Sequence, residues 1–145
     1  MSKITEQTIQ DTNIQFYKAF ESLSLERMEK VWKHSDDIVC VHPGWDLFRG
    51  WMAVRESWIT IFQNTERIQF LITNVKVRAF ENILAVVICL ENIETIINQD
   101  KIRMGVIATN IFERQHIVRN DKSEWLMIHH HGSPVSNYIS PNTSV

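Results

Sequence analysis

Three side chains set in apolar surroundings could carry acid–base chemistry. His42 directly follows the apolar run 38–41, and an imidazole changes its charge near neutral pH, which suits a general base. Glu91 interrupts the run LAVVICLENI, where a carboxylate needs a hydrogen bond, an ion pair or a function because an unpaired buried charge is strongly unfavourable. Asn110 interrupts the next apolar run in the same way. His42, Glu91 and Asn110 are therefore the candidate catalytic residues.

Each of these residues also has a structural explanation. A histidine at this position could hydrogen-bond the turn in which it lies, and Glu91 and Asn110 could occupy a sheet edge or a subunit interface. Two aromatic residues are further candidates for contact with a ligand. Tyr17 lies beside the apolar face of the first expected helix, and Trp45 lies in the loop after Pro43-Gly44.

The run HHHG near the C-terminus offers a second set of polar side chains. Strand alternation is expected to place His130 on one face and, on the other, Trp125, Met127, His129, His131 and Ser133. Two imidazoles two residues apart could share a metal ion with a third ligand. No Asp or Cys has a supporting spacing, so we predict no metal and no cofactor. A ligand pocket or a subunit interface is the expected setting for Trp125, His129, His131 and Ser133.

Length, composition and net charge limit the class of protein. With 145 residues, of which 44% are hydrophobic, the chain suits one domain at 1–135, followed by a short polar tail at 136–145 that is expected to fray. A net charge of -2 predicts no broad attraction to nucleic acid or to an anionic membrane. Both cysteines lie in apolar runs, no stretch could span a membrane and the N-terminus has no signal-peptide core. A reduced, cytoplasmic protein is expected.

Apolar periodicity predicts three helices in the N-terminal half. The first is expected from Thr5, as its N-cap, to about Ser22, and the second begins with Ser24 as its N-cap. The third follows Gly50 and carries apolar residues at helical spacing as far as Phe62. Clustered aromatic residues in this third helix indicate that it covers a curved sheet.

Runs rich in Ile, Val, Phe and Thr predict the strands. They cover 38–41, 47–49, 68–80, 83–97, 101–115 and 124–133. Short polar turns join the four long runs, which favours antiparallel neighbours. The expected fold is therefore α+β, with three helices covering a strongly bent, mostly antiparallel sheet of about six strands. Such a sheet encloses a cone whose wide end is the expected ligand pocket, with His42 and Cys40 facing inward.

Three segments resemble SnoaL-like proteins of the nuclear transport factor 2-like superfamily. They are FYKAFESLSLERMEKVW, DDIVCVHPGWDLFRGWMAVRESW and the final run WLMIHHHGSP. The resemblance covers residues 5–135 and extends to ketosteroid isomerases, polyketide cyclases and the association domain of calcium/calmodulin-dependent kinase. It implies the cone-shaped fold and a dimer. It leaves the chemistry open, because one fold hosts many functions.

Ketosteroid isomerases allow a direct comparison of sites. They use an Asp base together with a Tyr and a protonated Asp that form an oxyanion hole. At the matching positions this chain has His42 for the base, Phe16 or Tyr17 for the tyrosine, and Asn110 near the second aspartate. The resemblance therefore disfavours a steroid isomerase of that mechanism. A His base with Asn and Tyr as hydrogen-bond donors could still abstract a proton.

The residues and the resemblance leave three functions open. The first is a SnoaL-like domain that binds a small apolar molecule carrying a carbonyl or carboxylate. The second is an isomerase, cyclase or dehydratase that uses His42 with Glu91, Asn110 or Tyr17. The third is an oligomerisation module like the kinase association domain. Apolar residues occupy both faces of the expected strand at 83–97. A homodimer through the antiparallel sheet is therefore also expected.

Overall fold

The chain folds around one sheet of six strands. In chain order they are β1 (Val39–Val41), β2 (Phe48–Arg49), β3 (Arg67–Phe80), β4 (Leu84–Ile97), β5 (Asp100–Arg119) and β6 (Lys122–Val135). Their order in space is β2-β1-β6-β5-β4-β3, and only β1 and β6 pair in parallel. The structure is a computed structural model, and it describes residues 1–119, 122–139 and 141.

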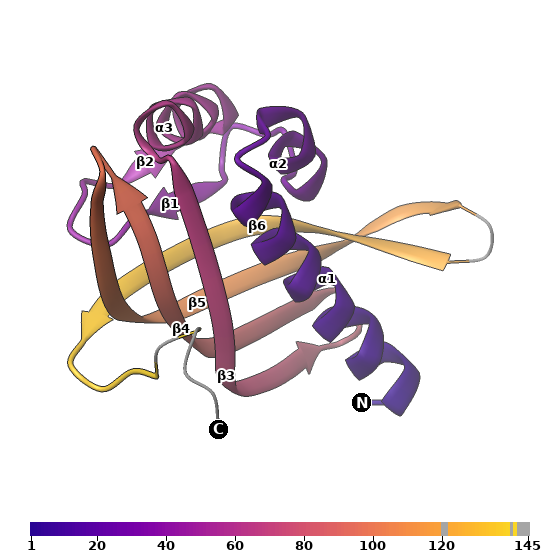
Figure 1. Cartoon of the computed structure of the whole chain (residues 1–145). Helices are drawn as coiled ribbons and strands as arrows, with labels where there is room; N and C mark the ends of the chain where they lie inside the picture. The colour runs from indigo at the N-terminus through magenta and orange to yellow at the C-terminus, as the bar shows by residue number, and fades with distance from the viewer. Residues whose placement is uncertain (120–121, 140, 142–145) are drawn as a thin grey trace.

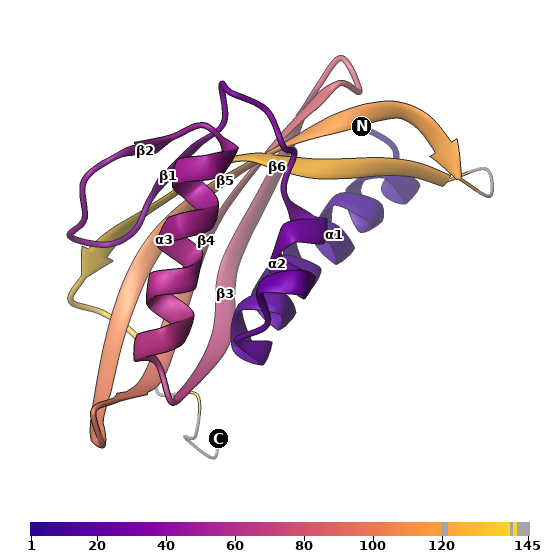
Figure 2. The same ribbon diagram turned by 90° about the horizontal axis from the view of Figure 1, so that it is seen from above.

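Three helices cover one side of this curled sheet (Figure 1). They are α1 (Lys3–Ser22), α2 (Leu25–Val31) and α3 (Trp51–Asn64). Figure 2 shows α1 and α3 on the same side of the long strands, with β3 and β4 running between them in that view. The predicted α+β class, with a bent and mostly antiparallel sheet under three helices, is confirmed.

Local sequence explains where the helices begin. Ser2 Oγ accepts a hydrogen bond from the backbone N–H of Thr5 at 3.1 Å, so α1 begins at Lys3, earlier than the predicted cap at Thr5. Ser24 caps α2 as predicted, since its Oγ accepts from the N–H of Arg27 at 3.3 Å. Gly50 precedes α3 with φ 86°, a conformation that glycine adopts at little cost.

Two tight turns join long strands into the predicted antiparallel meander, and neither turn contains an Asn-Gly pair. Glu81 and Asn82 have φ of 50° and 57°, and Asn98 and Gln99 have φ of 50° and 69°. Positive φ at both central residues matches the twist of the strands that such turns join. The turns therefore connect β3 to β4 and β4 to β5 as direct hairpins.

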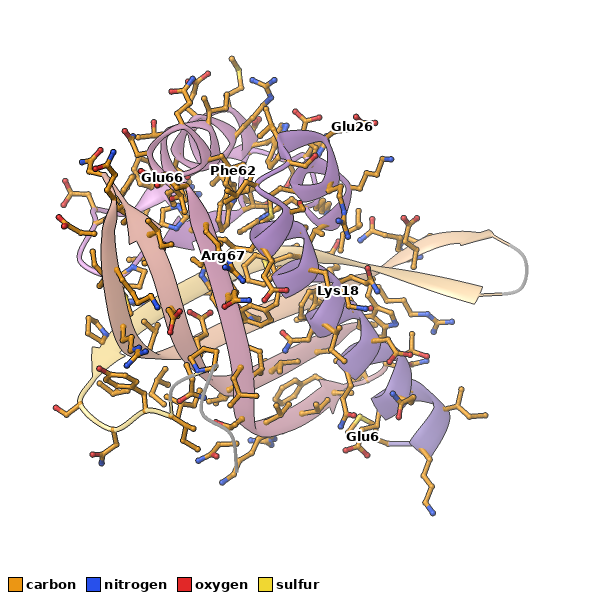
Figure 3. The ribbon with its side chains drawn as sticks, in the orientation of Figure 1. Glu6, Lys18, Glu26, Phe62, Glu66 and Arg67 are labelled. Carbon is orange, nitrogen blue, oxygen red and sulfur yellow. The ribbon has the colours of Figure 1, made fainter. Side chains whose placement is uncertain are left out.

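The core lies between the helices and the concave face of the sheet. Trp58 of α3 is fully buried, and its ring meets Phe20 edge-on with centroids 4.8 Å apart. Phe62 is half-buried and packs against the same core, whereas Lys18 on α1 and Glu26 on α2 are exposed (Figure 3). The expectation that α3 covers the sheet with aromatic side chains is thus confirmed.

A β-bulge reverses the alternation of β6 and corrects one expectation. Ile111 pairs with His129 but Phe112 pairs with Met127, so one extra residue, Ile128, is inserted in β6. Such a bulge shifts the following side chains to the opposite face. His130 is consequently buried on the inner face, together with Trp125 and Met127. The predicted shared face of Trp125, His129, His131 and Ser133 is wrong, because His131 and Ser133 are exposed.

Residues 136–139 of the expected C-terminal tail lie against the sheet, and residues 140 and 142–145 of that tail lie outside the described part of the chain. The backbone N–H of Ile139 donates to Asn92 Oδ1 at 2.6 Å. A Cβ added to Gly105, which pairs with Asn92 across β4 and β5, would lie 2.8 Å from Cβ of Tyr138. Tyr138 and Ile139 therefore lie on the outer face of the sheet, where Gly105 allows their close approach.

Candidate functional site

A cavity of about 210 Å³ lies between the helices and the curled sheet. Most of its wall is apolar and comes from α1, α3 and β3 to β5, with Phe20, Ile61, Ile68, Ile93 and Met104. Three ionisable side chains line it, namely His42, Glu91 and His130. In the part of the chain that the structure describes, no Lys or Arg lines this cavity.

Glu91 is the acid at this wall. It projects inward from β4, is 2% exposed, and its Oε2 accepts the hydroxyl hydrogen of Tyr17 at 2.6 Å. Burial raises the pKa of Glu91 to about 7, although the hydrogen bond from Tyr17 opposes the rise. Burial, followed by the charge of Glu91, also raises the pKa of Tyr17 well above its usual value. Near neutral pH Glu91 is therefore divided between its acid and carboxylate forms.

Asn110 links this acid to His130. The Asn110 amide nitrogen donates to Asn13 Oδ1 at 2.9 Å and to the Tyr17 hydroxyl oxygen at 3.1 Å. His130 Nδ1 lies 2.6 Å from Asn110 Oδ1. Because an amide oxygen only accepts, Nδ1 must carry the hydrogen. Burial, and then the neighbouring His42, lower the pKa of His130 well below its usual value.

His42 is buried but has a different set of partners. Its Nε2 lies 2.9 Å from Ser57 Oγ, and the Ser57 hydroxyl donates to the backbone carbonyl of Val54 at 2.6 Å. Since the hydroxyl has one hydrogen, Nε2 of His42 must donate to Ser57. Burial lowers the pKa of His42 to about 4. This imidazole is therefore neutral at physiological pH and hydrogen-bonded to α3.

The structure brings some of the predicted residues together and separates others. Tyr17, Glu91 and Asn110 form one hydrogen-bonded chain, and His42 lines the same cavity as Glu91. Trp45 lies at the cavity wall, 41% exposed. Trp125 faces inward without lining the cavity. His129 is half-buried, and the exposed His131 and Ser133 lie with it on the outer face.

Sequence reasoning missed three residues of the site, Asn13, Ser57 and His130. Asn13 shares the buried face of α1 with Ile9, Phe16 and Phe20, so its helical spacing could have indicated it. Ser57 stands next to Trp58 on the buried side of α3. His130 had no usable signal, because the bulge that turns it inward is not visible as a pattern of residue types.

Two observations limit other kinds of site. Among the residues that the structure describes, no group of three or more His, Cys, Asp or Glu is placed to hold a metal ion. No described helix is long and apolar enough to cross a membrane. Cys40 and Cys89 are both free and buried, and burial raises the pKa of each thiol.

A helix-covered, curled α+β sheet around an internal cavity defines an NTF2-like protein, and comparisons with known proteins agree. A solved structure from Streptomyces avermitilis, a "putative dehydratase from the NTF2-like family", is 30% identical with a TM-score of 0.80, covering 93% of this chain and 99% of that one. The model of the SnoaL-like domain matches residues 9–137. This chain therefore belongs to the SnoaL-like domain family.

Two further relatives are described as two different kinds of protein. A "putative calcium/calmodulin-dependent protein kinase type II association domain" from Thiobacillus denitrificans is 28% identical, with a TM-score of 0.74, over 88% of this chain and 94% of that one. F-box protein SKIP8 from Arabidopsis thaliana is 26% identical over 129 residues, which are 89% of this chain. The chain spans about half the length of this curated relative, 50%.

Proposed function

We propose that this chain binds a small, uncharged and mostly apolar molecule in the cavity, through a carbonyl group. One observation carries the proposal. Glu91 lies at the cavity wall with Oε2 held by Tyr17, and none of the hydrogen bonds among the described residues involves its Oε1. A protonated carboxyl group donates through its O–H, for which a carbonyl oxygen is the matching acceptor.

The charges around the cavity favour a carbonyl over a carboxylate. A bound carboxylate would need a cation or several donors to offset its loss of hydration. None of the described lining residues is Lys or Arg, and burial lowers the pKa of both His42 and His130. An anionic ligand would also face Glu91 when that group is ionised. Of the two ligand groups expected from the sequence, the ketone or aldehyde is the better match.

The volume of the cavity sets the size of the ligand. An engineered protein cavity of about 150 Å³ binds benzene, and this one measures about 210 Å³. Its capacity therefore suits a single ring with one or two polar substituents. The apolar lining from Ile68, Ile93 and Met104 would bury the ring.

An acid–base enzyme is the second candidate, and one observation favours it. A pKa of about 7 lets Glu91 give and take a proton near neutral pH. The 30% identical relative from Streptomyces avermitilis is described as a "putative dehydratase", and a dehydratase is one of the reaction types expected from the sequence. His42, the base proposed from the sequence, is less suited, because its Nε2 is bonded to Ser57 and its pKa is lowered to about 4.

We also propose that a second copy of the chain is the partner of the outer sheet face. Exposed apolar residues lie there on three neighbouring strands, with Leu71 38%, Ile88 43% and Ile107 38% exposed. An apolar patch across adjacent strands is typical of an interaction surface. The description of the 28% identical relative as a putative association domain also supports this proposal.

Calorimetric titration tests the ligand proposal with a matched pair of probes, cyclohexanone and cyclohexanecarboxylate. If only protonated Glu91 binds the ketone, affinity should fall by about tenfold between pH 6 and pH 8, as the protonated fraction falls. Glu91→Gln should remove this pH dependence, and Glu94→Gln, on the outer face of the same strand, should keep it. Tighter binding of the carboxylate, or a pH-independent ketone affinity, would contradict the proposal.

A further inference from the structure

The orientation of the Asn110 amide is fixed by its neighbours. A primary amide has two N–H donors and one acceptor oxygen. Both donors of Asn110 are used, one by Asn13 Oδ1 at 2.9 Å and one by the Tyr17 hydroxyl oxygen at 3.1 Å. Its oxygen must therefore face His130 Nδ1, 2.6 Å away. The side chain is fully buried, so water does not compete for these bonds.

This amide fixes the tautomer of His130. Nδ1 carries the hydrogen that Asn110 Oδ1 accepts, and a neutral imidazole has only one N–H group. Burial lowers the pKa of His130, so the ring stays neutral. Nε2 is then an unprotonated acceptor on a residue that lines the cavity. No hydrogen bond to Nε2 occurs among the described residues.

The same chain of bonds sets the role of Glu91. Tyr17 has a single hydroxyl hydrogen, which goes to Glu91 Oε2, so the tyrosine acts only as a donor towards this acid. The proton of the neutral acid is then carried on the other oxygen, Oε1. His130, Asn110, Tyr17 and Glu91 thus form one ordered series of bonds. An acceptor stands at one end of it and a donor at the other.

Most other polar groups of the lining already have partners within the protein. The hydroxyls of Thr60, Thr65 and Thr95 donate to backbone carbonyls at 3.1, 2.6 and 2.9 Å. The Asn64 amide donates one hydrogen to the carbonyl of Thr60 at 2.8 Å. Nε2 of His42 donates to Ser57, and Nδ1 of His42 lies 3.9 Å from Cys40 Sγ. Glu91 and His130 are the two lining groups that the series of hydrogen bonds holds in complementary roles.

We infer that the ligand of this cavity is a neutral hydroxy-carbonyl compound, whose hydroxyl donates to His130 Nε2 and whose carbonyl accepts from Glu91. The inference rests on the proposed binding of a carbonyl compound and adds the second polar group. A ligand with a carbonyl alone would leave the imidazole acceptor without a donor. Leaving a buried polar group unpaired is unfavourable, which disfavours such a ligand relative to its hydroxylated analogue.

A probe series tests this inference on the wild-type protein at pH 6. The probes are cyclohexanone, its 2-, 3- and 4-hydroxy derivatives and the corresponding methoxy ethers, which keep the oxygen but lack the donor hydrogen. At least one hydroxy ketone should bind about tenfold more tightly than cyclohexanone, the value of one well-made hydrogen bond. Its methoxy ether should lose that gain. Cyclohexanone binding with no gain from any hydroxyl would overturn the inference and leave the carbonyl proposal standing.

Histidine variants and nitrogen NMR supply independent tests. His130→Phe should abolish the gain from the hydroxyl, whereas His131→Phe, a matched change on the outer face, should retain it. In the free wild-type protein, ¹⁵N spectra should show His130 with Nδ1 protonated and Nε2 unprotonated. The hydroxy ketone should shift the Nε2 resonance. A hydrogen on Nε2 would overturn the inference, whether or not the His130→Phe variant folds. Failure of every ketone to bind would overturn both proposals together.

Discussion

Three consecutive histidines of β6 differ in their chemistry because they lie on opposite faces of the sheet. His130 faces inward, is 1% exposed and is fixed by Asn110. His129 and His131 face outward with ring centroids 6.4 Å apart, and His131 is exposed. Burial, and then His131, lower the pKa of His129. Strand alternation separates His130 from its two neighbours, and the residue inserted in β6 makes His130 the one that faces inward.

Two carboxylates on β4 repeat this contrast. Glu91 faces the cavity without a basic partner, and burial raises its pKa to about 7. Glu94 faces outward between Lys101 and Arg103, at 3.4 and 3.1 Å. Burial acts to raise the pKa of Glu94, but the bonds and charges of these two residues outweigh it, and the pKa is lowered. The inner face therefore keeps its acid close to its neutral form, and the outer face stabilises the ionised form.

The largest expected difference between buried and exposed sites concerns tryptophan. Trp58→Ala should destabilise the fold by roughly 3–5 kcal/mol, the range for removing a large buried aromatic side chain, because Trp58 is fully buried. Trp45→Ala should cost clearly less than Trp58→Ala, since Trp45 is 41% exposed. Urea denaturation of both variants measures this. Similar unfolding midpoints for the two variants would contradict the assignment of the core.

The next expected effect concerns the pH dependence of the free energy of unfolding, which should differ between Glu91 and Glu94. The folded pKa of Glu91, about 7, lies above its ordinary value of 4.5, so its contribution to stability is complete below 4.5 and is lost as the pH rises through 7. Relative to Glu91→Gln, the wild type should lose about 2.5 kcal/mol between pH 5 and pH 8. Taking this difference cancels the histidine contributions, which both proteins share.

Glu94→Gln should behave in the opposite sense. Because its folded pKa is lowered, Glu94 contributes stability that is present above its ordinary pKa and lost as the pH falls through the folded value. Denaturation curves of the three proteins from pH 3 to pH 8 make the comparison. Parallel pH profiles for Glu91→Gln and wild type would show that Glu91 ionises normally.

A smaller effect is expected on the outer face. If a second copy covers Ile107, an aspartate there would be buried without a partner. Ile107→Asp should weaken the dimer by at least about 2 kcal/mol, roughly thirtyfold in its dissociation constant. Ile4→Asp is the control, because Ile4 is 82% exposed on α1. Light scattering measures the molar mass of the protein in solution, and a wild-type monomer at micromolar concentration would rule out the dimer.

The smallest effect concerns the C-terminal segment. Ile139→Pro removes the N–H that donates to Asn92 Oδ1 at 2.6 Å, and Ile139→Val keeps it. The proline variant should lose about 1 kcal/mol, the net value of a typical hydrogen bond. Hydrogen exchange at Tyr138 should then become faster in Ile139→Pro than in Ile139→Val. Equal exchange in the two variants would show that the segment is not held there.

The fold could be predicted further than the site. Periodic apolar residues placed α1, α3 and the long strands, because burying one face imposes a spacing on the sequence. The same alternation predicted that His42 faces inward, whereas for Glu91 and Asn110 it left a sheet edge or a subunit interface as the alternative. It failed at His130, where a bulge that depends on pairing with β5 reversed the register. The pairing of Tyr17 with Glu91, 74 residues apart, depends on the packing of α1 across the sheet, which local patterns do not encode.

We propose that Glu91 is an acid of nearly neutral pKa that binds a carbonyl group. Selective ¹³C labelling of glutamate side chains, with Glu91→Gln to assign the signal, allows its carboxyl carbon to be titrated by NMR. We expect a midpoint near pH 7 that moves upward in saturating cyclohexanone, because the ketone binds the protonated form. A midpoint near 4.5, or one that cyclohexanone leaves unchanged, would contradict this role of Glu91.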